Sequence, residues 1–381
     1  MSASAASPPR LAGRLVSLDV FRGLTMAAMV VVNDPGDWDH AYWPLLHAEW
    51  NGWTPTDLIF PFFLFMVGVS MTLSKSTMGS RWKSVRRGLT IMALGALLAG
   101  FPRFPLATWR IPGVLVRIGV CYLAAVGIFR LTAPKPAPDD WRHARRLLWS
   151  TVALTVAYWV AMVWMPFPGH NPGDLTPEGN LGAFIDRAVI GQQHLWQRRP
   201  WDPEGLLSTV PAIASTLMGV MAGFWLRAPV GDGPRTLGLI AAGVAAMAAG
   251  SIWDLAFPIN KNLWTSSYAW FMGGAAALGL GLCYWIVDVR RWRWWTKPFV
   301  VLGVNAIALF MLSGLLAKLL LLIKVTGAAG KPVSLYSTIY RQVFAPMASP
   351  CNASLLFALA FLAALYVVLW VMYRRQIFLK V

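Results

Sequence analysis

Residues 113–132 read GVLVRIGVCYLAAVGIFRLT, an apolar stretch interrupted by two arginines. An α-helix rises about 1.5 Å per residue, so a stretch of this length covers about 30 Å, the thickness of the hydrocarbon core of a bilayer. Runs of comparable length recur along the chain. Of its 381 residues, 57% are hydrophobic and only 13% are charged, against about 25% charged in soluble domains. The sequence therefore predicts a polytopic helical membrane protein.

Ten such runs define the expected fold. They cover residues 15–32, 57–73, 88–101, 113–132, 147–165, 205–226, 236–253, 264–287, 298–323 and 353–373. We expect an all-α transmembrane bundle of about ten spans, forming a single domain over residues 1–381 with a flexible N-terminus at residues 1–14. Because ten is an even number, both termini should lie on the same side of the membrane.

The distribution of basic residues predicts which side that is. The segments on the side of the termini contain 21 Lys and Arg, whereas the alternate loops contain 9. The positive-inside rule therefore places both termini in the cytoplasm. The formal net charge of +17 belongs to these short loops, so no basic soluble face remains that would bind nucleic acid.

The loop between the first two expected spans, residues 33–57, has the strongest chemical signature. It contains no Lys or Arg, but five carboxylates, two histidines and two asparagines among aromatic residues. His47 is a candidate general base, because imidazole titrates near neutrality and a neighbouring carboxylate can fix its tautomer. A solvated outer loop would explain the same composition, so both interpretations stand. His40 and His47 lack the spacing of a metal site, and the cysteines suggest neither a metal knuckle nor a disulfide framework.

Ionisable side chains inside the spans are a second set of candidates, since a charge in a bilayer is costly unless it is paired or hydrated. Asp19 and Arg22 are three residues apart and share a helix face, so they can neutralise one another or serve a ligand. Arg117 has no acidic residue three or four positions away and must find an anion elsewhere. Lys318 is near the outer end of its span, where its side chain can reach the interface.

Several short motifs occur in an order that resembles a known family. They are RLVSLDVFRG (14–23), Asn33, HAEWNG (47–52), DLIFP (57–61), RIPGVL (110–115) with Arg117, DPEG (202–205), NKNLW (260–264) and Asn305. Together they look like the transmembrane acetyltransferase family of heparan-alpha-glucosaminide N-acetyltransferase, from about residue 14 to residue 310. Each motif is short, but their ordered combination is specific.

The resemblance implies a reaction and two site residues. In that family the histidine of the HAxWNG-like stretch is the active-site histidine, which corresponds to His47, and the asparagine that ends the first span, here Asn33, lies beside it. The donor is cytosolic acetyl-CoA and the acceptor is the amine of a terminal glucosamine on the far side, so the acetyl group crosses the bilayer. The chain looks like compact bacterial inner-membrane relatives, some linked to N-acetylglucosamine utilisation. The family also suggests a homodimer.

The remaining site residues follow from this resemblance and from side-chain chemistry. Arg22, Arg117 and Asn305 are expected to contact polar parts of acetyl-CoA; Arg in particular pairs with phosphate and stays charged when partly buried. Asp57 is expected to orient His47 or to bind the amine. The amino sugar or glucosamine-terminated glycan is expected to meet Trp50, Asn51, Glu204, Lys261, Asn262 and Trp264.

A transporter for an amino sugar is the alternative that the same residues leave open. In that interpretation the buried Asp19, Arg22 and Arg117 would gate a path and His47 would couple protons. It leaves the HAEWNG motif without a clear task, and no inverted repeat is visible in the sequence. The exact acceptor sugar, and the choice between an acetyl-histidine and direct transfer, also stay open.

Overall fold

The computed structural model describes residues 15–74, 80–132, 141–169, 171–326 and 331–379. The expected flexible N-terminus at residues 1–14 lies outside the described residues. The chain divides into two compact units, each with its own packing. The large unit contains Glu49–Gly52 and Phe60–Arg291, and the small unit contains Val16–Ala48, Trp53–Ile59 and Trp292–Val381. The assignment of the whole chain to a single domain stays a prediction.

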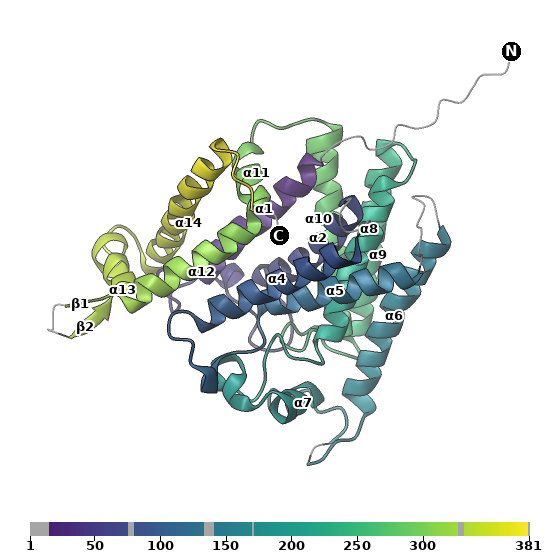
Figure 1. The fold of residues 1–381 in the computed structure, drawn as a ribbon, viewed down its shortest axis with the longest axis horizontal. Coiled ribbons are helices and arrows are strands. Elements are labelled where there is room, and N and C mark those ends of the chain that lie inside the picture. The colour runs from purple at the N-terminus through teal and green to yellow at the C-terminus, as the bar shows by residue number, and fades with distance from the viewer. Residues whose placement is uncertain (1–14, 75–79, 133–140, 170, 327–330, 380–381) are drawn as a thin grey trace. The chain divides into compact units, whose positions relative to one another are not determined.

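Helices build the large unit (Figure 1). They are α2 (Ile59–Leu73), α4 (Arg81–Gly100), α5 (Val114–Thr132), α6 (Trp141–Trp164), α7 (Leu181–Val189), α8 (Thr209–Arg227), α9 (Asp232–Asp254) and α10 (Ser266–Tyr284). A π-helical turn, Trp285–Val289, continues α10. Helix α9 packs along α10 and α4 along α5, while α8 packs against α5, α6 and α10. Helix α8 is therefore central to this unit.

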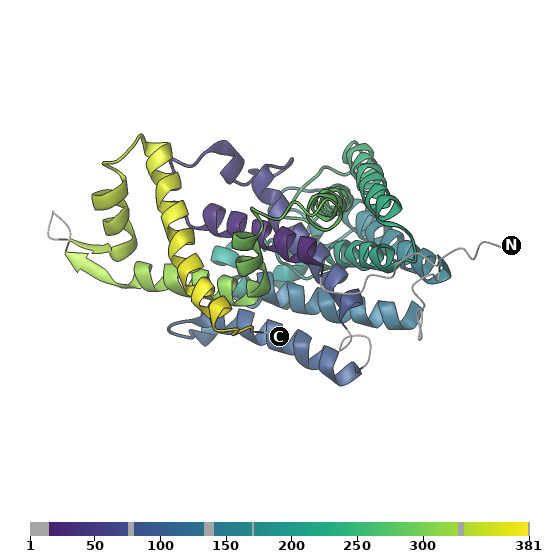
Figure 2. The ribbon, with the colours of Figure 1, turned by 90° about the horizontal axis from the view of Figure 1, so that it is seen from above.

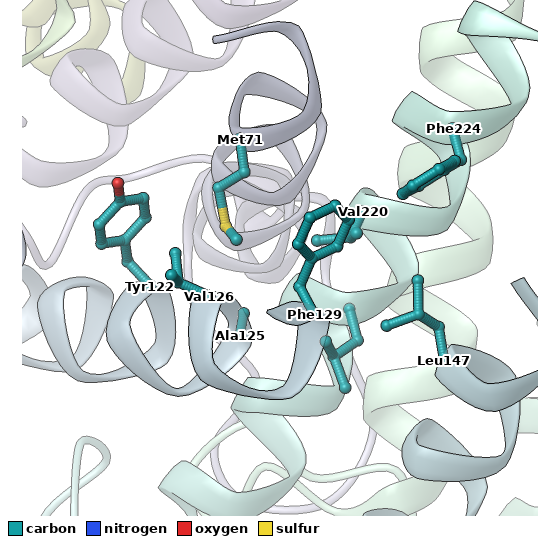
Figure 3. Packing of buried hydrophobic residues seen from close by; sticks show 9 residues of the cluster. Met71, Tyr122, Ala125, Val126, Phe129, Leu147, Val220 and Phe224 are labelled. Carbon is teal, nitrogen blue, oxygen red and sulfur yellow. The ribbon is translucent and has the colours of Figure 1, made fainter. Parts of the chain in front are cut away.

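Two apolar clusters hold the large unit together. The first gathers side chains of α2, α5, α6 and α8, and Figure 3 shows them converging: Met71, Tyr122, Ala125, Val126, Phe129, Leu147, Leu217, Val220 and Phe224. The second fixes the short helix α7 against α6 and the segment before α10, through Tyr158, Met162, Leu181, Phe257 and Leu263. Since lipid tails are as apolar as these side chains, close packing rather than transfer from water stabilises such contacts.

The small unit combines helices with one short hairpin. Its helices are α1 (Val16–Asn33), α11 (Lys297–Val304), α12 (Ala306–Leu322), α13 (Leu335–Ile339) and α14 (Pro350–Arg374). Strands β1 (Lys324–Thr326) and β2 (Pro332–Ser334) pair antiparallel, with Val325 opposite Val333. The hairpin lies at the end of α12 and leads into α13 (Figures 1 and 2). Helix α1 packs against α11, α12 and α14.

The expected pattern of spans is confirmed in part. Helices occupy all ten expected positions, but among the described residues eight are long and apolar enough to cross a membrane, or nine if α11 and α12 together count as one span. Helix α4 does not qualify by composition, because its first two turns contain Arg81, Lys83, Arg86 and Arg87. The side of the membrane on which the termini lie stays a prediction.

Two details of the structure depart from a bundle of straight helices. Residues 298–323 do not form one straight helix, because the axis bends by 81° between α11 and α12. Asn305 sits at the break with φ −117° and ψ 38°, outside the helical region. The β1–β2 hairpin also departs from a strictly all-α chain. Neither feature has a periodic signature that sequence patterns would reveal.

Candidate active site

The HAEWNG motif begins with a histidine that is paired to a buried carboxylate. His47 Nδ1 lies 2.7 Å from Asp57 Oδ1. The His47 side chain is 46% exposed, whereas that of Asp57 is fully buried. With the carboxylate accepting at Nδ1, the neutral ring has its hydrogen on Nδ1 and its lone pair on Nε2. One nitrogen is therefore oriented by the protein, and the other has the chemistry of a base.

Local sequence explains why Asp57 is fixed. The segment Thr54–Leu58 starts with a threonine N-cap and a proline, and forms a 3₁₀ turn with a capping box. Asp57 Oδ2 accepts from the Thr54 backbone N–H at 3.0 Å and from the Thr54 hydroxyl at 3.2 Å. The Ala48 N–H donates to the same oxygen at 3.2 Å, which ties the turn to the residue after His47. Both carboxylate oxygens are thus held before any ligand binds.

The second histidine of this loop offers a natural comparison. His40 Nδ1 lies 2.8 Å from Asp37 Oδ2, but both side chains are substantially exposed. The hydrogen bond with His40 lowers the pKa of Asp37. The two histidine–carboxylate pairs have similar distances, so what distinguishes His47 is the burial and the extra hydrogen bonds of its partner.

Asn33, the predicted neighbour of His47, is the exposed last residue of α1. The residue after it, Asp34, is 7% exposed, and burial raises its pKa to about 7. Asp34 is one of the five carboxylates counted in the loop at residues 33–57, and sequence reasoning assigned it no role of its own. Its burial comes from the packing of the small unit and has no signal in the local sequence.

We expect the contribution of Asp34 to the stability of the protein to fall as the pH rises from about 4 to about 7. Its pKa in the folded chain, about 7, exceeds its ordinary value of 3.8, so folding favours the protonated form and the advantage is lost as the carboxyl ionises. Asp34→Asn is neutral at every pH and should remove this part of the slope. Thermal midpoints in detergent at pH 5 and pH 8 measure it, and equal slopes in the two proteins would contradict it.

Two residues predicted to contact acetyl-CoA have partners within the small unit. Arg22 Nη1 lies 3.3 Å from Asp19 Oδ1 and 3.3 Å from the Gly303 carbonyl oxygen. The expected pairing of Asp19 with Arg22 is therefore present. Asn305 is fully buried at the α11–α12 break, where its amide donates to the Ile377 carbonyl at 3.1 Å and accepts from the Leu379 N–H at 3.0 Å. Asn305 thus fastens the C-terminal segment to the bend.

Arg117 occupies the first turn of α5 in the large unit and is 2% exposed. Its Nη2 donates to the Gly205 carbonyl at 3.1 Å and to the Ser208 hydroxyl. Its guanidinium carbon lies 5.3 Å from the centroid of the Trp264 ring. Within the described part of the chain, Nε and Nη1 have no hydrogen-bond partner. A buried cation with two unmatched donor nitrogens is costly, so the site is suited to an anionic or carbonyl oxygen.

The DPEG motif lies beside Arg117, and its two acidic residues form ion pairs with Arg110. Arg110 binds Asp202 through Nε at 3.2 Å and through Nη2 at 2.8 Å, and Nη2 also binds Glu204. Burial opposes the charge of Arg110, but Glu204 and Asp202 outweigh it and raise its pKa. Asp202 also accepts from the Trp196 N–H at 2.6 Å. Glu204, predicted to bind the acceptor, therefore already has a cationic partner.

The second half of the HAEWNG motif packs within the large unit. Trp50 Nε1 donates to the Leu175 carbonyl at 2.9 Å. Asn51 Oδ1 accepts from Asn260 Nδ2 at 3.0 Å. The Gly52 N–H donates to the Ile259 carbonyl at 2.7 Å, and its φ of 92° lies in the left-handed region that favours glycine. HAEWNG and NKNLW, more than 200 residues apart in the sequence, are thereby joined by backbone and side-chain bonds.

The NKNLW motif ends in a buried and strained tryptophan. Trp264 is 1% exposed and has φ 50°, which is unfavourable for a bulky residue. Its Nε1 donates to the Ser215 hydroxyl at 3.1 Å, and Phe60 packs edge-on at 5.0 Å. Lys261 and Asn262 are partly exposed at the turn before it. The contacts with Ser215 and Phe60 hold the side chain of this strained residue, and strained residues cluster at functional sites.

Sequence reasoning missed several residues of this region. Arg110 and Asn260 were quoted within motifs but received no role, although their motif positions were a usable signal. Ser208 and Asp186 had no such signal, because their contacts with the DPEG region arise only from the fold. The predicted site residues divide between the two units: His47, Asp57, Asn33, Arg22 and Asn305 belong to the small unit, and the others to the large unit.

Comparisons with known proteins place these residues in a family context. The model of the catalytic region of heparan-alpha-glucosaminide N-acetyltransferase matches residues 14–163. The human protein of that name is 30% identical, with 80% of this chain and 53% of the relative covered. The mouse protein is 31% identical, with 79% and 53% covered. The resemblance to this family is confirmed.

The chain spans about half the length of these heparan-alpha-glucosaminide N-acetyltransferases. The region that matches the catalytic family model contains the His47–Asp57 pair and Arg117. Glu204 and Trp264 lie beyond it.

Proposed function

We propose that this protein is an acetyl-CoA-dependent N-acetyltransferase that acts on the amine of a glucosamine-type sugar. The observation that carries the proposal is the His47–Asp57 pair, with its carboxylate held by Thr54 and Ala48. The pair lies in the segment that matches the catalytic model of the acetyltransferase family. A fixed carboxylate behind a partly exposed imidazole is an arrangement well suited to general base catalysis.

In the proposed reaction the amine nitrogen attacks the thioester carbonyl carbon, the carbon–sulfur bond breaks, and coenzyme A leaves as a thiol. His47 Nε2 accepts the proton that the amine loses, and this proton is then available to the departing thiolate. Asp57 stabilises the imidazolium that forms. The same pair also permits a covalent acetyl-histidine as an intermediate. Asn33 is proposed to donate to the developing oxyanion.

Arg117 is proposed to contact the acetyl donor. Its unmatched Nε and Nη1 donors fit a carbonyl or phosphate oxygen. Arg22 and Asn305 are also proposed contacts, but both are engaged by protein partners, so the cofactor would have to exchange with those bonds. Of the three residues proposed to contact acetyl-CoA, Arg117 is therefore the one with donors that no protein group in the described part of the chain already occupies.

The acceptor is proposed to bind through the residues that the large unit gathers around the DPEG and NKNLW motifs. Tryptophan faces stack on sugar rings, and amides bind hydroxyls. The proposed set is Trp50, Asn51, Glu204, Lys261, Asn262 and Trp264. Arg110 neutralises part of the negative charge of Glu204. We therefore propose that Glu204 binds either a hydroxyl group or the ammonium group of the sugar.

The sidedness of the reaction completes the proposal. The apolar helices and the family resemblance indicate an integral membrane protein. We propose that the donor enters from the cytoplasmic side, where the basic loops would attract the phosphates of coenzyme A, and that acetylation takes place on the periplasmic side of a bacterial inner membrane. A homodimer is part of the same proposal.

The experiment uses purified protein in detergent with acetyl-CoA and glucosamine. We expect one free thiol for each N-acetylated sugar, measured by thiol titration and mass spectrometry. N-Acetylglucosamine, which has no free amine, serves as the matched control and should release thiol only at the hydrolysis rate. A transporter for amino sugars would bind glucosamine and release no thiol, and this outcome would overturn the proposal.

A further inference from the structure

Asp186 is a buried carboxylate that the proposed reaction does not use. It lies on α7, a short helix outside the candidate membrane spans, and is 2% exposed. Its Oδ1 accepts from the Leu206 N–H at 2.8 Å. A Cβ placed on Gly205 would lie 1.9 Å from Asp186 Oδ2, so the carboxylate rests directly against that residue. The Asp186 carboxylate therefore holds the peptide that joins Gly205 to Leu206, through one hydrogen bond and one close contact.

The other end of the same peptide faces Arg117. The Gly205 carbonyl accepts from Arg117 Nη2 at 3.1 Å. It also accepts from the Ser208 hydroxyl at 3.2 Å and from the Thr209 hydroxyl at 2.8 Å. One peptide group thus links a carboxylate at its N–H to a guanidinium at its carbonyl. A carboxylate that accepts from the N–H polarises the peptide and strengthens the carbonyl as an acceptor.

The orientation of Arg117 follows from this link. Its Nη2 is anchored to Gly205 and Ser208, and its flat face lies over Trp264. These contacts fix the plane of the guanidinium and hence the direction of the unmatched Nε and Nη1 donors. A small shift of the Gly205 carbonyl would turn both donors.

We propose that Asp186 is a positioning residue, which holds the Gly205–Leu206 peptide so that Arg117 presents Nε–H and Nη1–H to an oxygen of the acetyl donor. The naming of acetyl-CoA as the ligand rests on the proposed function; the link between Asp186 and Arg117 does not. Burial raises the pKa of Asp186 to about 6, so the carboxylate is mainly ionised at pH 7.5, where it can polarise the peptide.

A double-mutant cycle tests the proposal at pH 7.5. Asp186→Ala is expected to raise the KM for acetyl-CoA about tenfold with a smaller change in kcat, and to have little further effect in the Arg117→Ala background. Asp186→Asn keeps an oxygen for the Leu206 N–H and should restore most of the loss. Glu178→Gln, which removes an exposed negative charge near α7, is the matched control and should leave the KM unchanged.

Several outcomes would overturn the inference. Asp186→Ala could leave the KM unchanged, or could raise it equally with and without Arg117. If Asp186→Ala does not fold, Asp186→Cys replaces it in the cycle, because a thiol is only a weak acceptor for the Leu206 N–H. An unchanged KM, or a loss that persists unchanged in the Arg117→Ala background, would then contradict the link.

The proposed function can fail separately. A wild-type protein without thiol release would refute the acetyltransferase. The link between Asp186 and Arg117 is then measured from thermal midpoints of the same four proteins without ligand. Additive midpoint shifts would overturn it, and non-additive shifts would support it.

Discussion

His47→Ala is expected to slow acetyl transfer by about 10²- to 10⁴-fold, while the protein folds and binds acetyl-CoA as before. The side chain is partly exposed, and its partner Asp57 keeps the hydrogen bonds from Thr54 and Ala48 when the imidazole is removed. The turn should therefore survive the substitution. What disappears is the nitrogen that accepts the proton of the amine, so kcat should fall far more than the affinity for acetyl-CoA.

His40→Ala is the matched control. It removes a histidine from the same loop, also paired to a carboxylate at hydrogen-bonding distance, but the side chain of its partner Asp37 is 32% exposed, not buried. Its turnover should stay within about threefold of wild type. The comparison is made by single-turnover kinetics with acetyl-CoA and glucosamine, with thermal midpoints to verify folding. Near-normal turnover of His47→Ala, or equal losses in the two variants, would remove His47 from the mechanism.

Gly219→Val is expected to prevent normal folding of the large unit. Helices α2 and α8 approach so closely that a Cβ on Gly219 would lie 1.9 Å from the Phe65 carbonyl oxygen, and a Cβ on Gly68 would lie 2.0 Å from the Thr216 carbonyl oxygen. Both obstacles are backbone atoms, which cannot rotate away. Overpacking typically costs about 1–3 kcal/mol and more when the backbone must move, so the helices should separate.

Gly127→Ala provides the control for this prediction. Gly127 lies in α5, and a Cβ there would have no heavy atom within 4 Å. Alanine is a better helix former than glycine by about 1 kcal/mol, so stability should be unchanged or slightly raised. Size-exclusion profiles and thermal midpoints in detergent compare the two variants. A Gly219→Val protein that is monodisperse with a wild-type midpoint would contradict the close packing of α2 and α8.

The His47–Asp57 pair shows how far local sequence can lead. The two residues are ten positions apart, and a threonine N-cap, a proline and an aspartate at the third position specify the turn that presents the carboxylate. Imidazole chemistry indicated a base, and the structure supplies its orientation. The sequence did not distinguish His47 from His40, because both have a carboxylate partner and the difference is in how deeply each carboxylate is buried.

Arg117 marks the limit of that reasoning. The sequence indicated that a charge within a span needs a polar partner, but not which one. The partners are a carbonyl and a hydroxyl about 90 residues further along the chain, and a tryptophan ring in the turn before α10. Asp186 had even less signal, since it accepts from the Leu206 N–H and, within the described residues, forms no direct hydrogen bond with Arg117.

By itself, the sequence predicted the helical membrane class and the positions of the helices, and it indicated the histidine of the HAEWNG motif as a candidate base. These depend on apolar length, composition and short-range capping, which are local properties of the chain. Only the tertiary structure decided the bend at Asn305, the burial of Asp34 and the carboxylate–peptide–guanidinium link from Asp186 to Arg117. Each of these depends on which distant groups satisfy a buried polar atom, and that choice is made by the packing of whole helices.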